Sequence, residues 1–203
     1  MVQKPDIPVT RASAARLPEN LLYSTYAPDV PTRYLFARGR LELARGDLES
    51  ARATATEIRT YALPPEEQDF TEEMAASYLE AMASLAAGET ETALERARTA
   101  VELDGYRYFI YRTALVEALR RQGQLGEAAD VAAEATAERD WIDPRLDLEL
   151  DRMRLILIES EIRMEMGETV TAERLARAFL ERWSRSERDH PDVARARRLA
   201  GPS

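Results

Sequence analysis

Residues 46–51 have the sequence GDLESA, and the same pattern, a glycine followed five positions later by an alanine, occurs three more times. The later copies are GETETA at 88–93, GQLGEA at 123–128 and GETVTA at 167–172. Glycine suits the left-handed cap that ends a helix, and the polar residue after it can help to open the next helix. An alanine in that second helix lets two antiparallel helices cross closely. The pattern therefore predicts four helix-turn-helix pairs.

Further small residues recur in the same register. The second helix of each pair has another alanine four positions later, and the first helix has a small or compact residue seven positions before its glycine. These residues are Ala55, Ala97, Ala132 and Ala176 in the second helices, and Gly39, Ala81, Val116 and Ser160 in the first helices. Agreement over four copies favours an internal repeat. The alternative is a generic helical bundle in which a common residue recurs by composition.

The segments between these turns have the pattern of helices. None shows a sustained period-two alternation, and alanine, leucine, glutamate and arginine, which favour helix, dominate the composition. The expected helices span residues 32–44, 48–61, 65–87, 90–103, 107–122, 125–139, 144–166, 169–184 and 191–199. Pro65, Pro144 and Pro191 stand where helices are expected to begin, since the first turn needs no amide hydrogen there. We therefore expect an all-α fold.

The chain is expected to have three parts. Five prolines within residues 1–31 predict an extended leader. The repeat domain follows at 32–189, with helix pairs at about 32–63, 64–105, 106–143 and 144–189. Residues 190–203 are expected to form a capping helix and a tail, because the last pair of a helical array exposes an apolar end that must be covered. That helix would cover Phe179 and Trp183.

The repeated segments resemble the tetratricopeptide repeat family. The resemblance is clearest at 39–51 and 123–128, and residues 100–105, AVELDG, look like the usual end of a repeat in that family. It extends over roughly residues 32–185. The successive glycines 46, 88, 123 and 167 are 42, 35 and 44 residues apart, against a family period of about 34. The resemblance implies a right-handed antiparallel helix-hairpin solenoid of about four repeats, with irregular curvature where helices are lengthened.

This resemblance implies a function as well as a fold. It implies a non-catalytic scaffold that binds a peptide or a helix of a partner protein in a concave groove lined by the first helix of each pair. The groove positions that it implies are Arg33, Phe36, Arg40, Tyr78, Met82, Thr113, Glu117, Arg120, Arg154, Leu157 and Glu161.

Two kinds of side chain in this set suggest what would bind. Phe36, Tyr78 and Met82 would form an adaptable apolar floor, and three of the arginines would donate hydrogen bonds to an acidic group. Burial between repeats is the alternative for Tyr78 and Met82. Phe36 and Arg40 stand where chaperone-binding members of the family hold a terminal carboxylate with lysine and asparagine, so that activity is not expected.

Two other functions stay open. The chain could self-associate, for example as a homodimer through an end helix. It could also be an accessory repeat region of a larger protein, because arrays of this texture are similar to those attached to bacterial kinases, cyclases and transcriptional regulators. Light scattering separates a monomer with an open groove from a dimer that buries it.

Composition argues against several other classes. The net charge is −9 and the pI is about 4.9, so nucleic acid is not an expected partner. Cysteine is absent, which excludes thiolate chemistry, and His190 is the one histidine, expected to be a solvated hinge residue. No catalytic residue, cofactor or metal site is predicted. Asp143, Asp147 and Asp151 have helical spacing, but arginines among them favour an ion-paired face over a cation site.

The sequence also bears on location. It has no apolar run of the roughly 20 residues that a membrane-spanning helix needs, and the first eight residues lack the apolar core of a signal peptide. A cytoplasmic protein without membrane insertion is expected; the alternative is a soluble piece of a larger or exported chain. Lys4 is the only lysine beside many arginines, which indicates a GC-rich genome.

Overall fold

A computed structural model describes residues 30–62, 71–104, 108–137, 146–183 and 190–201. In these ranges the chain is helical with short connections and contains no strand. The helices are α3 (Val30–Ala44), α4 (Leu48–Arg59), α5 (Thr71–Ala87), α6 (Thr90–Glu102), α7 (Phe109–Arg121), α8 (Leu125–Ala137), α9 (Leu146–Glu165), α10 (Thr169–Trp183) and α11 (Pro191–Leu199). The all-α prediction is confirmed for these residues.

The predicted helix starts agree closely with the observed ones. Helices α4, α6, α8, α10 and α11 begin at the residues expected, and α3 begins at Val30, two residues early. The predicted starts at Pro65 and Pro144 and the leader at 1–29 lie outside the described residues. Pro191 occupies the first turn of α11, as expected.

Each of the four predicted turns has the same backbone geometry. In the first, the Gly46 N–H donates to Leu43 O (3.0 Å) and the Asp47 N–H donates to Glu42 O (2.9 Å). This pair of bonds is the Schellman motif, which satisfies carbonyl groups at the end of a helix. The same two bonds recur around Gly88, Gly123 and Gly167, and the four glycines have φ between 76° and 79°. Because other residues rarely adopt this φ, the repeated glycine is a backbone requirement.

The small residues lie where helices approach closely. The four alanines five positions after the glycines, and the four that follow them one turn later, are completely buried. A Cβ atom on Gly39 would come within 2.5 Å of a methyl carbon of Leu79, so α3 and α5 meet with little side chain between them. Ser160 is also fully buried, and its hydroxyl donates to Ala172 O (2.7 Å) on α10.

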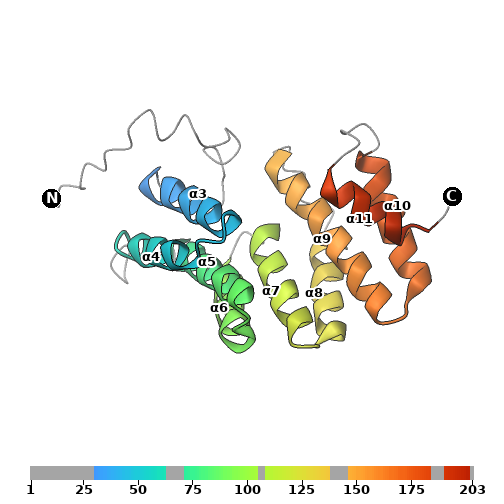
Figure 1. Ribbon diagram of the computed structural model, residues 1–203, viewed down its shortest axis with the longest axis horizontal. Helices are drawn as coiled ribbons and strands as arrows, with labels where there is room; N and C mark the ends of the chain where they lie inside the picture. Colours follow the sequence, from blue (N-terminus) through green and yellow to red (C-terminus); the bar gives the residue numbers. More distant parts are fainter. Residues whose placement is uncertain (1–29, 63–70, 105–107, 138–145, 184–189, 202–203) are drawn as a thin grey trace.

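Consecutive helices lie side by side along the molecule. Each helix contacts the next, and α3, α5, α7 and α9 also contact one another in succession, a set that we call the odd-helix layer; α11 contacts α9 at the end of this layer. Within the described ranges, successive even-numbered helices lack a comparable contact. Figure 1 shows the helix pairs following one another along the longest axis, with α3 and α4 toward one end of the molecule and α10 and α11 toward the other.

Two apolar clusters hold these helices together. The larger one runs from α3 to α9. The smaller one joins α9, α10 and α11, and in it Val193 and Ala196 of α11 pack with Phe179 of α10. The Trp183 ring stacks on Phe179 with ring centroids 5.5 Å apart. Helix α11 therefore covers Phe179 and Trp183, as predicted.

Side chains at the helix starts behave differently from one another. Asp47 caps α4 by accepting from the Ser50 N–H (3.1 Å), whereas Glu89 makes no such cap and accepts from the Ser84 hydroxyl (3.0 Å) instead. His190 caps α11, because its Nδ1 accepts from the Asp192 N–H (3.2 Å). His190 was expected to be a solvated hinge residue; its side chain is 41% exposed, and its ring also lies 4.9 Å from that of Trp183.

Candidate functional site

The predicted groove residues all lie on the odd-helix layer, but they have very different environments. Phe36 and Leu157 are completely buried and Tyr78 is only 8% exposed. Phe36 and Leu157 therefore offer no surface to a partner and complete the core instead. Met82 is half-buried against the same core, so the apolar floor expected from Phe36, Tyr78 and Met82 is largely enclosed.

The aromatic side chains form a row through the first three helices of the layer. The Tyr78 ring on α5 lies between Phe36 on α3 (centroids 5.5 Å apart) and Tyr111 on α7 (5.7 Å). Tyr108 continues the row at 6.1 Å from Tyr111. Tilted and edge-on ring contacts of this kind add stability to the fold beyond that which comes from burying their apolar area. We call these four residues the aromatic row.

Arg40 lies at the edge of the aromatic row. Its guanidinium carbon is 5.9 Å from the centre of the Phe36 ring, a cation–π distance. Within the described part of the chain, no carboxylate forms an ion pair with Arg40. Burial raises the pKa of Tyr78; the charges of Arg40 and of Arg154 from α9 lower it, and the charge of Asp151, also from α9, raises it.

The remaining predicted residues of the first three pairs are less open. The hydroxyl of Thr113 donates to the carbonyl of Phe109 one turn earlier (2.9 Å), so its polar group is satisfied within α7. Arg33 is half-buried on α3. Neither residue approaches the exposure of Arg154, whose side chain is 52% exposed.

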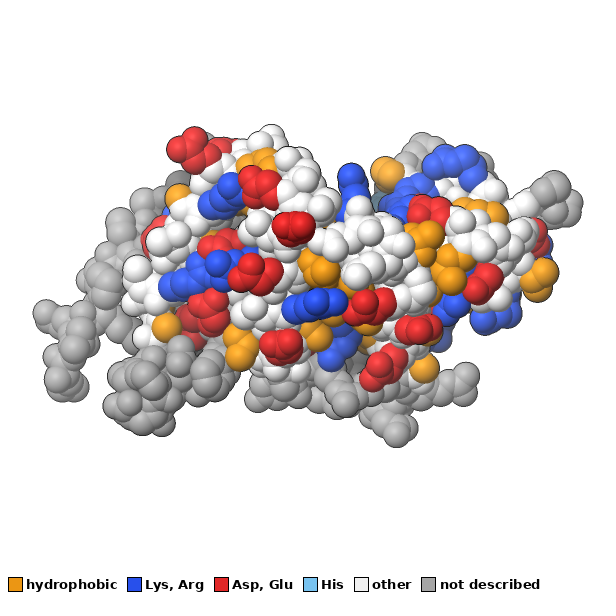
Figure 2. Space-filling model, turned by 90° about the horizontal axis from the view of Figure 1, so that it is seen from below, with side chains coloured by type: hydrophobic (Ala, Val, Ile, Leu, Met, Phe, Trp, Pro, Cys, Tyr) orange, Lys and Arg blue, Asp and Glu red, His pale blue; other side chains and the backbone are white. Residues whose placement is uncertain are grey.

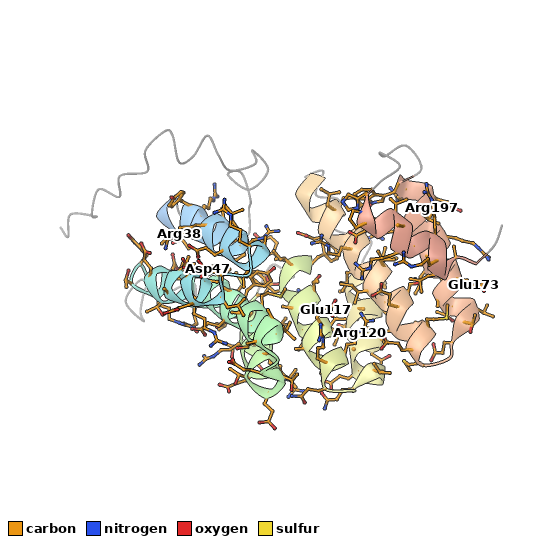
Figure 3. The ribbon with its side chains drawn as sticks, in the orientation of Figure 1. Arg38, Asp47, Glu117, Arg120, Glu173 and Arg197 are labelled. Carbon is orange, nitrogen blue, oxygen red and sulfur yellow. The ribbon has the colours of Figure 1, made fainter. Side chains whose placement is uncertain are left out.

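The structure brings three other predicted residues together in a charged cluster. Arg120 on α7 donates to Glu161 (2.9 Å) and to Glu165 (3.0 Å) on α9, and it lies 4.0 Å from Glu117. Glu117 and Arg120 are seen close together on α7 in Figure 3, near the middle of the molecule. Of the predicted arginines, Arg120 is thus already supplied with carboxylates.

Sequence reasoning missed two members of this cluster, Asp192 and Arg195, both on α11. Arg195 of α11 donates to Glu161 through Nε and Nη2, both at 2.8 Å, and to Asp192 through Nη1 at 2.9 Å. Arg154 lies 3.8 Å from the same Asp192. The signal was present as three arginines in the last helix, but only the fold shows that α11 places one of them on α9. We call Glu117, Arg120, Glu161, Asp192 and Arg195 the charged cluster.

Two carboxylates of the charged cluster have opposite pKa shifts. Burial raises the pKa of Glu117, and the nearby Arg120 only partly offsets it. Burial acts in the same direction on Glu161, but hydrogen bonds and charge from Arg195 and then Arg120 outweigh it, and the pKa of Glu161 falls below its usual value. Glu161 is thus the carboxylate on which the two arginines converge.

Other surfaces differ from the odd-helix layer. Figure 2 shows one face on which acidic and basic side chains alternate, with apolar side chains between them. A hollow of about 370 Å³ lies on α6 beside Gln122, and none of the predicted groove residues lines it.

The described ranges show neither a metal site nor a membrane span. Over the described ranges, no group of three or more histidine, cysteine, aspartate or glutamate residues could hold a metal ion. Of the aspartates with helical spacing, Asp143 and the side chain of Asp147 lie outside the described residues. No helix in the described part of the chain is long and apolar enough to cross a membrane.

Comparison with known proteins adds no assignment. No protein-family model, no curated protein and no solved structure matches the chain. Any function therefore has to be argued from the residues of the odd-helix layer themselves.

Proposed function

We propose that the chain is a non-catalytic scaffold of the tetratricopeptide-like kind that binds an acidic segment of a partner protein on the odd-helix layer. The observation that carries this proposal is the placement of Arg40 and Arg154. These arginines come from α3 and α9: the Arg40 guanidinium lies over the Phe36 ring, and the Arg154 side chain is 52% exposed. A surface that gathers cationic groups from separate helices suits an extended or helical segment that crosses those helices.

The repeated turn supports the scaffold part of the proposal. Four turns share one hydrogen-bond pattern and one glycine conformation, although their spacing along the chain varies. A repeated turn, followed each time by buried alanines in the second helix, repeats the geometry of each helix pair. Stacked pairs of this kind form a solenoid whose first helices line one continuous surface, and the odd-helix layer is that surface in this proposal.

The charges suggest what the partner carries. Arg40 has no carboxylate partner among the described residues, and Arg154 has only a distant one in Asp192, at 3.8 Å. Arginine binds carboxylates with paired hydrogen bonds, and such bonds are stronger than those between neutral groups. A partner segment with one or two carboxylates would pair with both arginines.

The proposal is tested with two charge-reversed variants of equal net charge. One carries Arg40→Glu and Arg154→Glu on the odd-helix layer. The matched control carries Arg45→Glu and Arg182→Glu, both on exposed arginines elsewhere. Each protein is used to capture partners from a native extract, and the bound proteins are identified by mass spectrometry.

We expect the wild type and the control variant to retain the same proteins and the odd-layer variant to lose them. If all three retain the same proteins, the odd-helix layer is not the binding surface. Light scattering of the same proteins covers self-association: a dimer that only the odd-layer variant loses would identify a second copy of the chain as the partner.

A further inference from the structure

Helix α11 packs against two of the residues that were predicted to bind a partner, Leu157 and Glu161. Leu157 of α9 shares an apolar cluster with Val193 and Ala196 of α11. Glu161 of α9 accepts two hydrogen bonds from Arg195 at 2.8 Å. The C-terminal part of the odd-helix layer is therefore already occupied by a segment of the chain itself.

The side-chain pattern of α11 is that of a helical ligand. Val193 and Ala196, three positions apart, are buried on one side, and Leu199 continues that side. Arg195 projects from the edge of this apolar side to reach Glu161. A helix that lays apolar residues into a groove and pairs a charge at its rim is a common form of peptide recognition.

The attachment of α11 rests on few contacts. The helix has 9 residues, which is too short to be stable as an isolated helix in water. Its fully or nearly buried apolar side chains are Val193, Ala196 and, after the helix, Ala200. A short element with few buried contacts opens at a lower free energy than the core does. Undocking of α11 would leave the helices from α3 to α8 in contact.

Glu161 links this attachment to the rest of the layer. It accepts from Arg195 of α11 and also from Arg120 of α7, at 2.9 Å. An incoming segment that pairs with Glu161 therefore has to displace Arg195 and compete with Arg120. The position of α11 and the charge that a partner meets on α7 and α9 are thus coupled through one carboxylate.

We propose that α11 occupies the C-terminal part of the layer until a partner helix displaces it. The partner helix has the same pattern as α11: two apolar residues three positions apart and an arginine directly before the second. This inference rests on the proposed function, because it concerns the regulation of the same surface. It predicts two states of the chain: one with α11 docked and the C-terminal part of the layer closed, and one with α11 released and that part open.

The test uses the helix as its own competitor. A fluorescent synthetic peptide with the wild-type sequence of residues 190–201 is titrated into three versions of the full chain. These are the wild type, the Arg195→Glu variant and the Arg195→Gln variant. Arg195→Glu places a carboxylate against Glu161 and should release α11, and Arg195→Gln only removes the charge. Arg198→Glu, on an exposed residue of the same helix, is the matched control.

We expect the peptide to bind the Arg195→Glu chain at least about tenfold more tightly than the wild type, because the apparent affinity scales with the fraction of open sites. Arg195→Gln should give a smaller gain and Arg198→Glu none. Hydrogen exchange should show faster exchange in residues 191–199 of the Arg195→Glu chain with unchanged exchange in α3–α6.

Two results would overturn the inference. One is faster exchange of α11 in the variants without tighter binding of the peptide. The other is loss of the whole fold in both Arg195 variants, which would make α11 a structural cap that no partner can displace. Because the peptide comes from the chain itself, these results stand apart from the partner-capture test on Arg40 and Arg154.

Discussion

The two ends of the odd-helix layer are stabilised in different ways. At the α3–α5 end, Phe36 and Tyr78 of the aromatic row are buried, and their neighbour Arg40 has no carboxylate partner among the described residues. At the α7–α11 end, Arg120 and Arg195 both share Glu161. Packing therefore supports the first end and leaves Arg40 available, whereas ion pairs support the second end and use Arg120 and Arg195. The first end is the better candidate for binding a partner, and the second for regulating it.

Substitution of Phe36 by alanine should have the largest effect on stability. Phe36 is completely buried beside Tyr78, and removal of a buried aromatic side chain costs about 3–5 kcal/mol. We expect the midpoint of urea unfolding to fall accordingly, with Phe36→Leu, which keeps most of the volume, losing much less. An unchanged midpoint in Phe36→Ala would mean that the aromatic row does not support this end.

That prediction marks the limit of what the sequence could show about the site. Helical spacing places Phe36 and Arg40 on one side of α3, but it does not say how close α5 comes. Gly39 lets α3 approach Leu79, and this approach encloses Phe36 while Arg40 stays half-exposed. How deeply a residue on the contact side of a helix is buried depends on how close the neighbouring helix comes. The local sequence pattern carries no information about that distance.

The fold could be predicted from the sequence more fully than the site, for a physical reason. A positive φ at Gly46 and the close crossing at Ala51 are local demands, which only glycine and small residues meet. Repetition over four pairs made these demands visible in the sequence. The pairing of Arg195 with Glu161 joins residues 34 positions apart, and no repeat or spacing marks it.

Removal of the shared carboxylate should give the next largest effect. In Glu161→Ala, Arg120 and Arg195 both lose a partner whose side chain is only 17% exposed. We expect a loss of about 1–3 kcal/mol, between the values for exposed and for buried ion pairs. The control is Glu165→Ala, which removes a more exposed partner of Arg120, 42% exposed, and should cost under about 1 kcal/mol. Equal losses in urea unfolding would show that Glu161 has no special place in the cluster.

The pH dependence of stability should separate the two shifted carboxylates. The pKa of Glu161 is lowered in the folded chain, so its contribution is present above the unfolded value, near 4.5, and is lost as the pH falls through the folded value. The pKa of Glu117 is raised, so the fold loses stability as the pH rises from the unfolded value through the folded one.

Glutamine variants test these opposite signs. Between about pH 4 and about pH 7, Glu161→Gln should lose stability relative to the wild type, and Glu117→Gln should gain it. Thermal unfolding across this range measures both differences. The same sign in both variants would contradict the assignment of burial to Glu117 and of guanidinium contacts to Glu161.

The smallest effect on stability is expected for Arg40→Glu. Arg40 lies over the Phe36 ring without a carboxylate partner among the described residues, so reversal of its charge forfeits only a weak cation–π contact, within about 0.5–1 kcal/mol. Arg195→Glu has the same change of charge at the other end, but it places a carboxylate against Glu161 and should destabilise more. Urea unfolding of the two variants compares the ends directly. If Arg40→Glu is the more destabilising, Arg40 supports the fold, and the case for a binding arginine at this end is lost. If it is nearly silent while partner capture fails, its place beside Tyr78 serves recognition.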